Sequence, residues 1–213
     1  MKAGRLARRL GLRIVRQMGE ALAYAHARNV IHRDVKSSNV LLTPESWALL
    51  ADFGIAKVLE GSAVLSRTGT IAGTPEYMAP EQGHGKADHR SDIYALGVIL
   101  YEVLTGRVPY EAETPLAVLI KHMQDPPPLP LSRVVAPEVS ERLEKVILKA
   151  MAKDPGERFQ SCAEFLGALE GSPLSLARDE AEARRRRLGE LVRKAEAALE
   201  MDPLHAGARA CLS

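Results

Sequence analysis

Residues 92–105 read DIYALGVILYEVLT, and almost every side chain in this stretch is apolar. A helix that is apolar on all sides has to be buried, because no face of it suits water. Gly106 stands where a helix C-cap is expected, and Pro109 follows closely. The apolar part, 93–104, contains Glu102 and is too short to cross a bilayer. We therefore expect other elements of a soluble core to surround this helix.

Periodicity predicts what those other elements are. Helical spacing of apolar residues predicts an amphipathic helix over about 5–28. β-prone runs predict short strands at 30–31, 40–42 and 47–50, and a turn at 43–46 joins the last two in a hairpin. The predicted fold class is mainly α, of the α+β kind, with one or two small hairpins.

The second half of the chain reads mostly as helix after an irregular stretch at 54–80, which is rich in Gly, Ser and Thr. A further amphipathic helix is expected after the Pro-rich loop 125–131. Its apolar positions are Leu143, Val146, Ile147 and Ala150. Ser161 and Glu164 match a capping box that opens a helix running to Leu169.

Composition changes near residue 171, which predicts three parts. Residues 1–170 form the folded domain, 171–187 a charged linker and 188–213 an amphipathic helix. Residues 194–209 resemble the second helix of a tetratricopeptide repeat followed by its Asp-Pro turn. One partial copy leaves that interpretation open, because such repeats need stacked neighbours to be stable.

Charge and cysteine content exclude several classes of protein. The formal net charge is only +2, so no global basic field favours nucleic-acid binding. Arginines 184–187 are expected to be a solvated helix face or linker, with a lipid or nucleic-acid contact as the alternative. Cys162 and Cys211 are far apart and have no His neighbours, which argues against a disulfide framework or a Cys-based metal site. The basic N-terminus lacks the apolar core of a signal peptide, so we expect a cytoplasmic location and no membrane segment in this chain, while a full-length parent could be membrane-anchored outside it.

The residues that carry chemistry lie around the hairpin. Asp34 and Asn39 bracket a loop, and Asp52 lies at the far end of the hairpin. Folding the hairpin brings Asn39 and Asp52 side by side, an amide and a carboxylate of the kind that suits Mg²⁺. Asp34 could accept a proton from a hydroxyl, and Lys36 could neutralise a phosphoryl group in transfer.

Three stretches resemble protein kinases. Residues 32–39 (HRDVKSSN) resemble the catalytic loop of these enzymes. Residues 52–54 (DFG) resemble their metal-binding motif, and residues 79–81 (APE) resemble the end of their activation segment. Lys36, and Thr74 before PEYMAPEQ, match the Ser/Thr-specific type. Over residues 10–170 the chain is most similar to bacterial eukaryotic-like (Hanks-type) Ser/Thr kinases.

The resemblance implies transfer of the ATP γ-phosphate to Ser or Thr hydroxyls of proteins, with Mg²⁺ or Mn²⁺ as the metal. Asp34 would orient the hydroxyl and take its proton, Lys36 would steady the γ-phosphate, and Thr74 would bridge the two. Asn39 and Asp52 would hold the metal. The resemblance also implies that Leu41 would lie under the adenine ring and that His32 and Phe53 would stack in a hydrophobic spine.

The resemblance also implies regulatory and structural residues. Arg33 would pair with a phosphate on the activation segment, whose candidate acceptors are Ser66, Thr68 and Thr70. Asp92 would hold the backbone of the catalytic loop, and Glu81 with Arg158 would form a buried ion pair. Protein substrates are the implied partners, and a homodimer could support autophosphorylation.

The family's small N-terminal lobe has no counterpart in the sequence. No Gly-x-Gly-x-x-Gly occurs, and the only Lys before residue 32 is Lys2, in no strand context. We therefore expect the C-terminal lobe only, with apolar residues 40–42 exposed and little transfer activity by the chain alone. A truncated gene model is the favoured explanation, ahead of a fragment that borrows a small lobe or serves as a non-catalytic scaffold. A pseudokinase is disfavoured, because the catalytic residues are intact.

Overall fold

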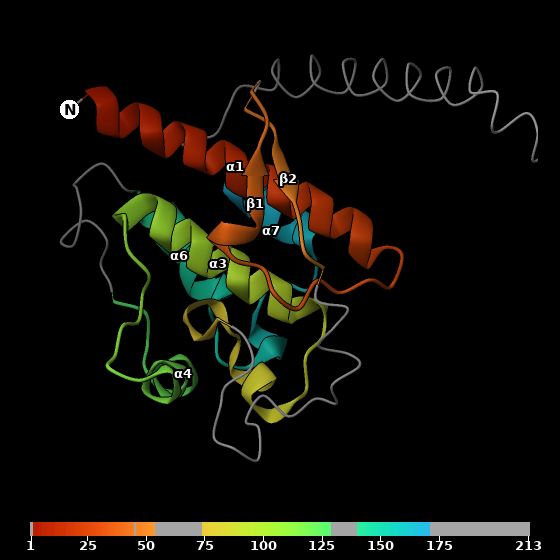
Figure 1. The fold of residues 1–213 in the computed structure, drawn as a ribbon, viewed down its shortest axis with the longest axis vertical. Helices are drawn as coiled ribbons and strands as arrows, with labels where there is room; N and C mark the ends of the chain where they lie inside the picture. The colour runs from red at the N-terminus through yellow and green to blue at the C-terminus, as the bar shows by residue number, and fades with distance from the viewer. Residues whose placement is uncertain (1, 45, 54–73, 129–139, 171–213) are drawn as a thin grey trace, which may run out of the picture. The chain divides into compact units, whose positions relative to one another are not determined.

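The computed structural model describes residues 2–44, 46–53, 74–128 and 140–170 (Figure 1). Over these residues the fold is mainly helical with one small hairpin, which confirms the predicted fold class. In chain order the elements are α1 (Lys2–His26), η1 (Ser37–Asn39), β1 (Val40–Leu42), β2 (Ala48–Leu50), η2 (Pro75–Tyr77), η3 (Pro80–His84), α3 (His89–Thr105), α4 (Pro115–Gln124), α6 (Glu141–Ala150), η4 (Pro155–Glu157) and α7 (Cys162–Glu170). The expectations for 171–187 and 188–213 fall outside the described residues.

Helix α3 is the centre of the core, as its apolar sequence predicts. Every residue from 91 to 101 is buried. The helix begins at His89, where the Asp88 side chain accepts a hydrogen bond of 2.7 Å from the backbone N–H of Arg90. It ends at Thr105, and the following Gly106 adopts a left-handed φ of 78° and donates its N–H to the carbonyl of Glu102. Such a conformation favours glycine, because other residues pay a steric penalty for it.

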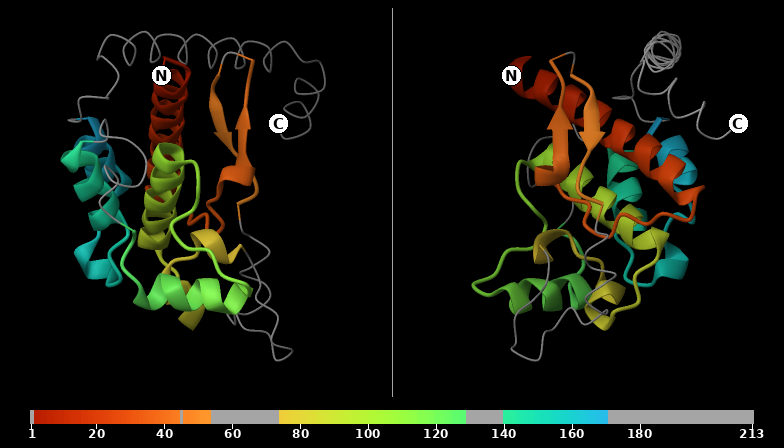
Figure 2. Two further views of the ribbon diagram at one scale, coloured as in Figure 1. Left: turned by 90° about the vertical axis from the view of Figure 1, so that its left-hand side faces the viewer. Right: turned by 45° about the vertical axis from the view of Figure 1, so that its right-hand side comes forward.

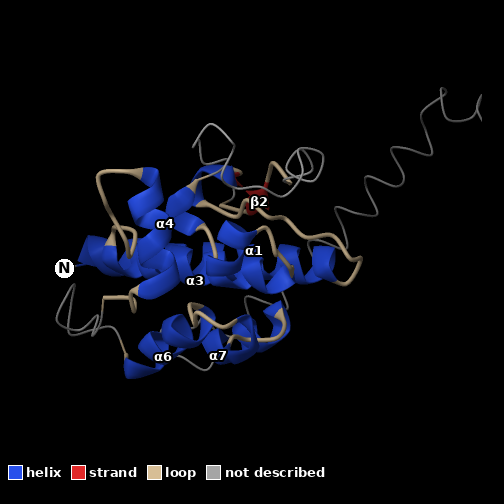
Figure 3. Ribbon diagram, turned by 90° about the horizontal axis from the view of Figure 1, so that it is seen from below, coloured by secondary structure: helices blue, strands red, loops and turns tan. Residues whose placement is uncertain are grey.

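The remaining helices surround α1 and α3 in layers. Figure 3 shows α6 and α7 on one side of α1 and α3, and α4 and β2 on the other. The two views of Figure 2 agree, because the hairpin stands on the side away from the blue-green helices α6 and α7. Helix α6 packs its predicted apolar positions into the core. Among the described residues, no helix is both long and apolar enough to span a membrane.

The hairpin forms with the predicted strands and turn. Val40 pairs with Leu50 and Leu42 with Ala48, in antiparallel register. Gln17 of α1 accepts a hydrogen bond from the backbone of Ala48, which ties the hairpin to the long helix. The outer surface of the hairpin is apolar and exposed. Its exposed residues are Leu41 (56%), Leu42 (51%) and Leu49 (54%). Val40, which we expected to be exposed, packs partly against the core instead.

Three local predictions need correction. Residues 30–31 form no strand, because no other segment pairs with them in the described structure. Helix α4 was not predicted; it starts at Pro115 behind the Thr114 side chain, which caps the backbone of Ala117. The capping box at α7 is only half formed.

At α7, the Ser161 hydroxyl accepts from the backbone of Glu164. The Glu164 carboxylate, however, accepts from the backbone of Gln160 instead of returning to Ser161. Ser161 therefore caps the start of α7 as predicted, but without the reciprocal bond from Glu164. Helix α7 extends one residue past the predicted end, to Glu170.

Candidate active site

The loop that follows α1 is held in place by one buried carboxylate. Asp92, near the start of α3, is 1% exposed and accepts two backbone hydrogen bonds of 2.9 Å, from His32 to Oδ2 and from Arg33 to Oδ1. Arg33 adopts a left-handed φ of 65°, which is unfavourable for a residue with a side chain. The carboxylate therefore holds a strained loop at the residue before Asp34.

His32 is buried in the core and contacts two backbone groups, one in the loop and one after strand β2. It is fully buried, and its Nδ1 accepts from the backbone N–H of Asp34 while Nε2 lies 3.0 Å from the carbonyl of Ala51. These partners define the neutral imidazole with the proton on Nε2. Burial lowers the pKa of His32 and so favours that neutral form. The ring stacks on Phe53 with centroids 4.5 Å apart.

Asp34, Lys36 and Thr74 form a linked polar group. The Nζ of Lys36 lies 2.9 Å from Oδ2 of Asp34 and donates a 2.9 Å hydrogen bond to the hydroxyl of Thr74. Both charged side chains are mostly covered, with exposures of 18% for Asp34 and 20% for Lys36. Thr74 is 38 residues further along the chain, so the contact joins the segment that begins at Thr74 to the loop that carries Asp34.

Asn39 and Asp52 both lie at the base of the hairpin. The N–H of Ala51 donates to the carbonyl of Asn39 at 2.9 Å, which places Asp52 one residue past that contact. The amide nitrogen of buried Asn39 donates to the Asp34 carbonyl at 2.8 Å and to its carboxylate at 3.3 Å. The Asn39 amide oxygen is thereby left as an acceptor. Asp52 is exposed and has a left-handed φ of 56°.

The residues present fit a magnesium ion better than a transition metal. An amide oxygen and a carboxylate are hard ligands, and Mg²⁺ is usually bound by one or two such groups plus phosphate oxygens and water. In the described part of the chain, no cluster of three or more His, Cys, Asp and Glu side chains could hold a metal.

A second polar group beside the catalytic loop was missed by the sequence reasoning. Glu102 accepts hydrogen bonds from the hydroxyls of Ser37 and Tyr77, the latter at 3.0 Å. Burial, the largest cause, raises the pKa of Tyr77 to about 12, and the neighbouring Glu102 charge acts in the same direction. The available signal was Glu102 itself, an acidic residue inside an otherwise apolar helix.

Arg33 lines a hollow beside Asp34. The other residues that line it include Thr74, Tyr77, Gln82 and Ser91. The Nε atom of Arg33 is buried and makes no hydrogen bond within the described residues. Gln82 donates to the Arg33 carbonyl at 3.1 Å and so anchors the backbone. The candidate phosphate acceptors Ser66, Thr68 and Thr70 lie outside the described residues.

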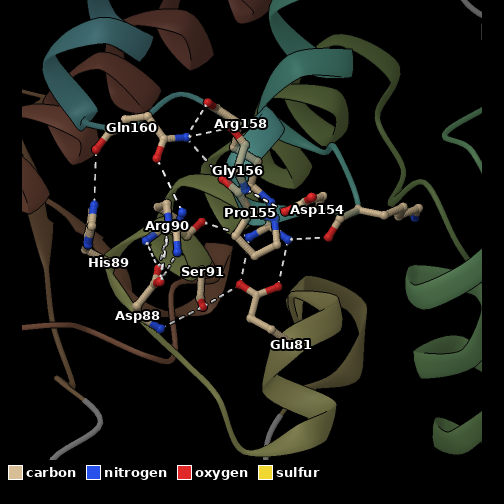
Figure 4. A network of polar contacts seen from close by, with 11 residues as sticks. Glu81, Asp88, His89, Arg90, Ser91, Asp154, Pro155, Gly156, Arg158 and Gln160 are labelled. Carbon is tan, nitrogen blue, oxygen red and sulfur yellow. Dashed lines mark hydrogen bonds and ion pairs between the residues drawn. The ribbon is translucent and has the colours of Figure 1, made fainter.

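Glu81 and Arg158 form a bidentate ion pair (Figure 4). Each Nη atom of Arg158 lies 2.7 Å from a different carboxylate oxygen of Glu81, and Arg158 is 1% exposed. Ser91 donates a third hydrogen bond to Glu81, at 2.7 Å. The remaining Arg158 hydrogen bonds go to the backbone carbonyls of Ala152, Arg90 and Lys153. The pair joins the end of the activation segment to the loop before α7, with every donor of Arg158 used.

Comparison with known proteins agrees with this geometry. The protein kinase domain family matches residues 2–167. The serine/threonine-protein kinase Pkn1 of Myxococcus xanthus is 46% identical over 162 residues, which cover 74% of this chain and 23% of the relative. The serine/threonine-protein kinase PknB of Mycolicibacterium smegmatis is 40% identical over 169 residues, covering 78% and 27%.

A third relative, the serine/threonine-protein kinase PknA of Mycobacterium tuberculosis, is 40% identical over 169 residues, covering 79% of this chain and 38% of its own. The chain thus spans about a quarter to two fifths of the length of these curated relatives. The match covers the catalytic loop, the hairpin and the buried ion pair. With motifs, geometry and comparisons in agreement, the chain belongs to the protein kinase family, among the bacterial Hanks-type Ser/Thr kinases.

Proposed function

We propose that this chain carries the catalytic residues of a serine/threonine protein kinase, which transfers the γ-phosphate of ATP to hydroxyls of protein substrates. The observation that carries the proposal is the contact of Lys36 Nζ with both Asp34 and Thr74, each at 2.9 Å. A carboxylate and an ammonium group are thereby held together in a mostly covered site. Phosphoryl transfer depends chiefly on such positioning and on charge stabilisation.

Each group then has one role. Asp34 accepts the proton of the substrate hydroxyl, Lys36 faces the transferred phosphoryl group, and Thr74 orients Lys36 through its hydroxyl. Asn39 and Asp52 would hold Mg²⁺, which supplies positive charge to the phosphate oxygens. The hydrogen bonds from Asn39 to Asp34 hold the proposed base and the proposed metal ligand next to each other.

We also propose that transfer requires a small lobe over the hairpin. Leu41, Leu42 and Leu49 are each more than half exposed, and an apolar surface of this kind favours a covering segment. Leu41 would lie under the adenine ring there. Without cover the nucleotide faces water, which weakens charge stabilisation of the transition state. Within the described residues no contact favours a non-catalytic scaffold, and the predicted base, Lys36 and metal ligands are retained.

The proposed activity would be regulated by phosphorylation near the same site. Phosphate on Ser66, Thr68 or Thr70 would gain charge-assisted hydrogen bonds from the buried Nε side of Arg33. A homodimer would allow one copy to phosphorylate the other, and a cytoplasmic location stays a prediction. If mass spectrometry of active, autophosphorylated protein found none of the three residues modified, this regulatory role would be wrong.

The test compares the 213-residue chain with the same chain joined to a small lobe from a bacterial Ser/Thr kinase. Both proteins are incubated with Mg²⁺, radiolabelled ATP and casein, and the labelled residues are identified. We expect phosphoserine and phosphothreonine from the lobe-bearing protein and little label from the chain alone. Absence of label from the lobe-bearing protein contradicts the proposed activity, whereas equal label from both contradicts the need for a small lobe.

A further inference from the structure

Asp92 has a third partner besides the two loop amides. The Nε2 of His26, at the end of α1, lies 2.7 Å from Oδ2 of Asp92, the same oxygen that accepts from the backbone of His32. Among the ion pairs of the described residues, this histidine is the one basic side chain that contacts Asp92. A buried carboxylate needs such donors, because burial without them strongly disfavours its charge.

The other nitrogen of His26 faces a cysteine. The Sγ of Cys162, the first residue of α7, lies 3.6 Å from Nδ1. Cys162 is 2% exposed, and burial raises the pKa of its thiol to about 12. The thiol therefore keeps its proton and can donate it to Nδ1, a weak hydrogen bond. The edge of the His89 ring also meets the His26 ring, with centroids 5.7 Å apart.

We propose that His26 and Cys162 are positioning residues of the catalytic loop. Cys162 holds the imidazole so that Nε2 donates to Asp92, and Asp92 in turn holds the backbone amides of His32 and Arg33. Three segments far apart in the sequence, the end of α1, the start of α3 and the start of α7, thus fix the loop that carries Asp34. For its effect on catalysis, the inference rests on the proposed function.

The strained backbone explains why the loop needs this support. Arg33 keeps its left-handed φ only while its N–H is held by Oδ1 of Asp92. A carboxylate that loses the His26 hydrogen bond is free to turn, and both loop amides lose a fixed acceptor. Small displacements of a catalytic group of about 1 Å can slow a reaction by about 10²-fold.

Hydrogen exchange of the full 213-residue chain tests the proposal, with single amides resolved by NMR. The backbone amides of His32 and Arg33 report on their bonds to Asp92, and amides in the middle of α3 report on global unfolding. In His26→Leu we expect exchange at the two loop amides to rise about 10- to 100-fold relative to the α3 amides. His26→Gln, which keeps a nitrogen donor, should restore most of the protection.

The cysteine is tested in the same way, with a milder change. Cys162→Ala should raise loop exchange about two- to fivefold relative to α3, while Cys162→Ser, which keeps a hydroxyl donor, should not. The control is His84→Leu, a change at an exposed histidine of η3. A uniform rise at all core amides, or unchanged loop exchange in both His26→Leu and Cys162→Ala, overturns the proposal.

A second readout uses the lobe-bearing protein. His26→Leu should lower kcat while leaving KM for ATP nearly unchanged, and His26→Gln should recover kcat. Equal changes in His26→Leu and His26→Gln would contradict a positioning role. If the lobe-bearing protein without substitutions transfers no phosphate, the proposed function fails. The exchange result still decides whether His26 and Cys162 hold the loop through Asp92.

Discussion

Replacing Glu81 by Gln tests whether the buried ion pair is a main support of the fold. The substitution keeps the shape and one oxygen acceptor but removes the charge opposite Arg158. Arg158 is 1% exposed and would stay in place with its three backbone acceptors. Breaking a buried pair from one side costs about 3–5 kcal/mol, and we expect the lower end, about 3 kcal/mol, because Gln still accepts one hydrogen bond.

The assay is urea unfolding followed by circular dichroism, with the free energy of unfolding extrapolated to water. A matched control is Asp88→Asn, which removes the charge from the Asp88–Arg90 pair but keeps an N-cap side chain for α3. That pair is 36% and 28% exposed, so its loss should cost no more than about 1 kcal/mol. Equal costs for the two variants, or a cost below about 1 kcal/mol for Glu81→Gln, would refute the reasoning that burial sets the magnitude.

Three further predictions concern stability and the transfer reaction. Burial lowers the pKa of His122 to about 3, and the nearby Lys153 charge adds a smaller effect in the same direction. In the unfolded chain the pKa of a histidine is about 6.5. The unfolded state therefore binds the extra proton as the pH falls from about 6.5 towards 3, and stability falls over that range by up to about 1.4 kcal/mol per pH unit. Urea unfolding at pH 7 and 5 should show a smaller loss in His122→Leu, and parallel losses would contradict this. Gly97→Ala should cost about 1–3 kcal/mol in the same assay, because a Cβ there would lie 2.8 Å from Ala150, whereas Gly167→Ala, with nothing within 4 Å, should not destabilise. In the lobe-bearing protein, Thr74→Val should lower the transfer rate roughly tenfold through loss of the Lys36 hydrogen bond, and an unchanged rate would exclude that role.

The features that could be predicted from the sequence are those set by local pattern. Helix α3 follows from its uniform apolar sequence, and the hairpin from two β-prone runs around a turn. The same pattern predicted that the backbone of Asn39 lies beside the residues just before Asp52, because a hairpin places its two ends side by side. The strand at 30–31 was wrong for the converse reason, since a strand exists only with a partner, and two apolar residues do not specify one.

Contacts between distant side chains could not be predicted from local pattern, and those we expected, such as Glu81 with Arg158, came from the family resemblance alone. Ser37 and Tyr77 meet on Glu102, and Cys162 meets His26, only after the helices have packed. Nothing in the local sequence of these residues indicates the partner. Helix α4 was missed because its apolar residues form one short continuous run, 116–120, without clear helical periodicity, and Pro115 at its start reads equally well as part of a loop.

The most direct test of the account separates nucleotide binding from phosphoryl transfer at Asp34. The lobe-bearing protein and its Asp34→Asn variant are compared for Mg-ATP affinity by calorimetry and for initial rate of phosphate transfer to casein. If Asp34 accepts the substrate proton, the variant binds Mg-ATP within about threefold of the parent, but its transfer rate falls by about 10²- to 10⁴-fold. A variant that transfers phosphate at the parental rate would contradict the assignment of this site as the centre of a protein kinase reaction.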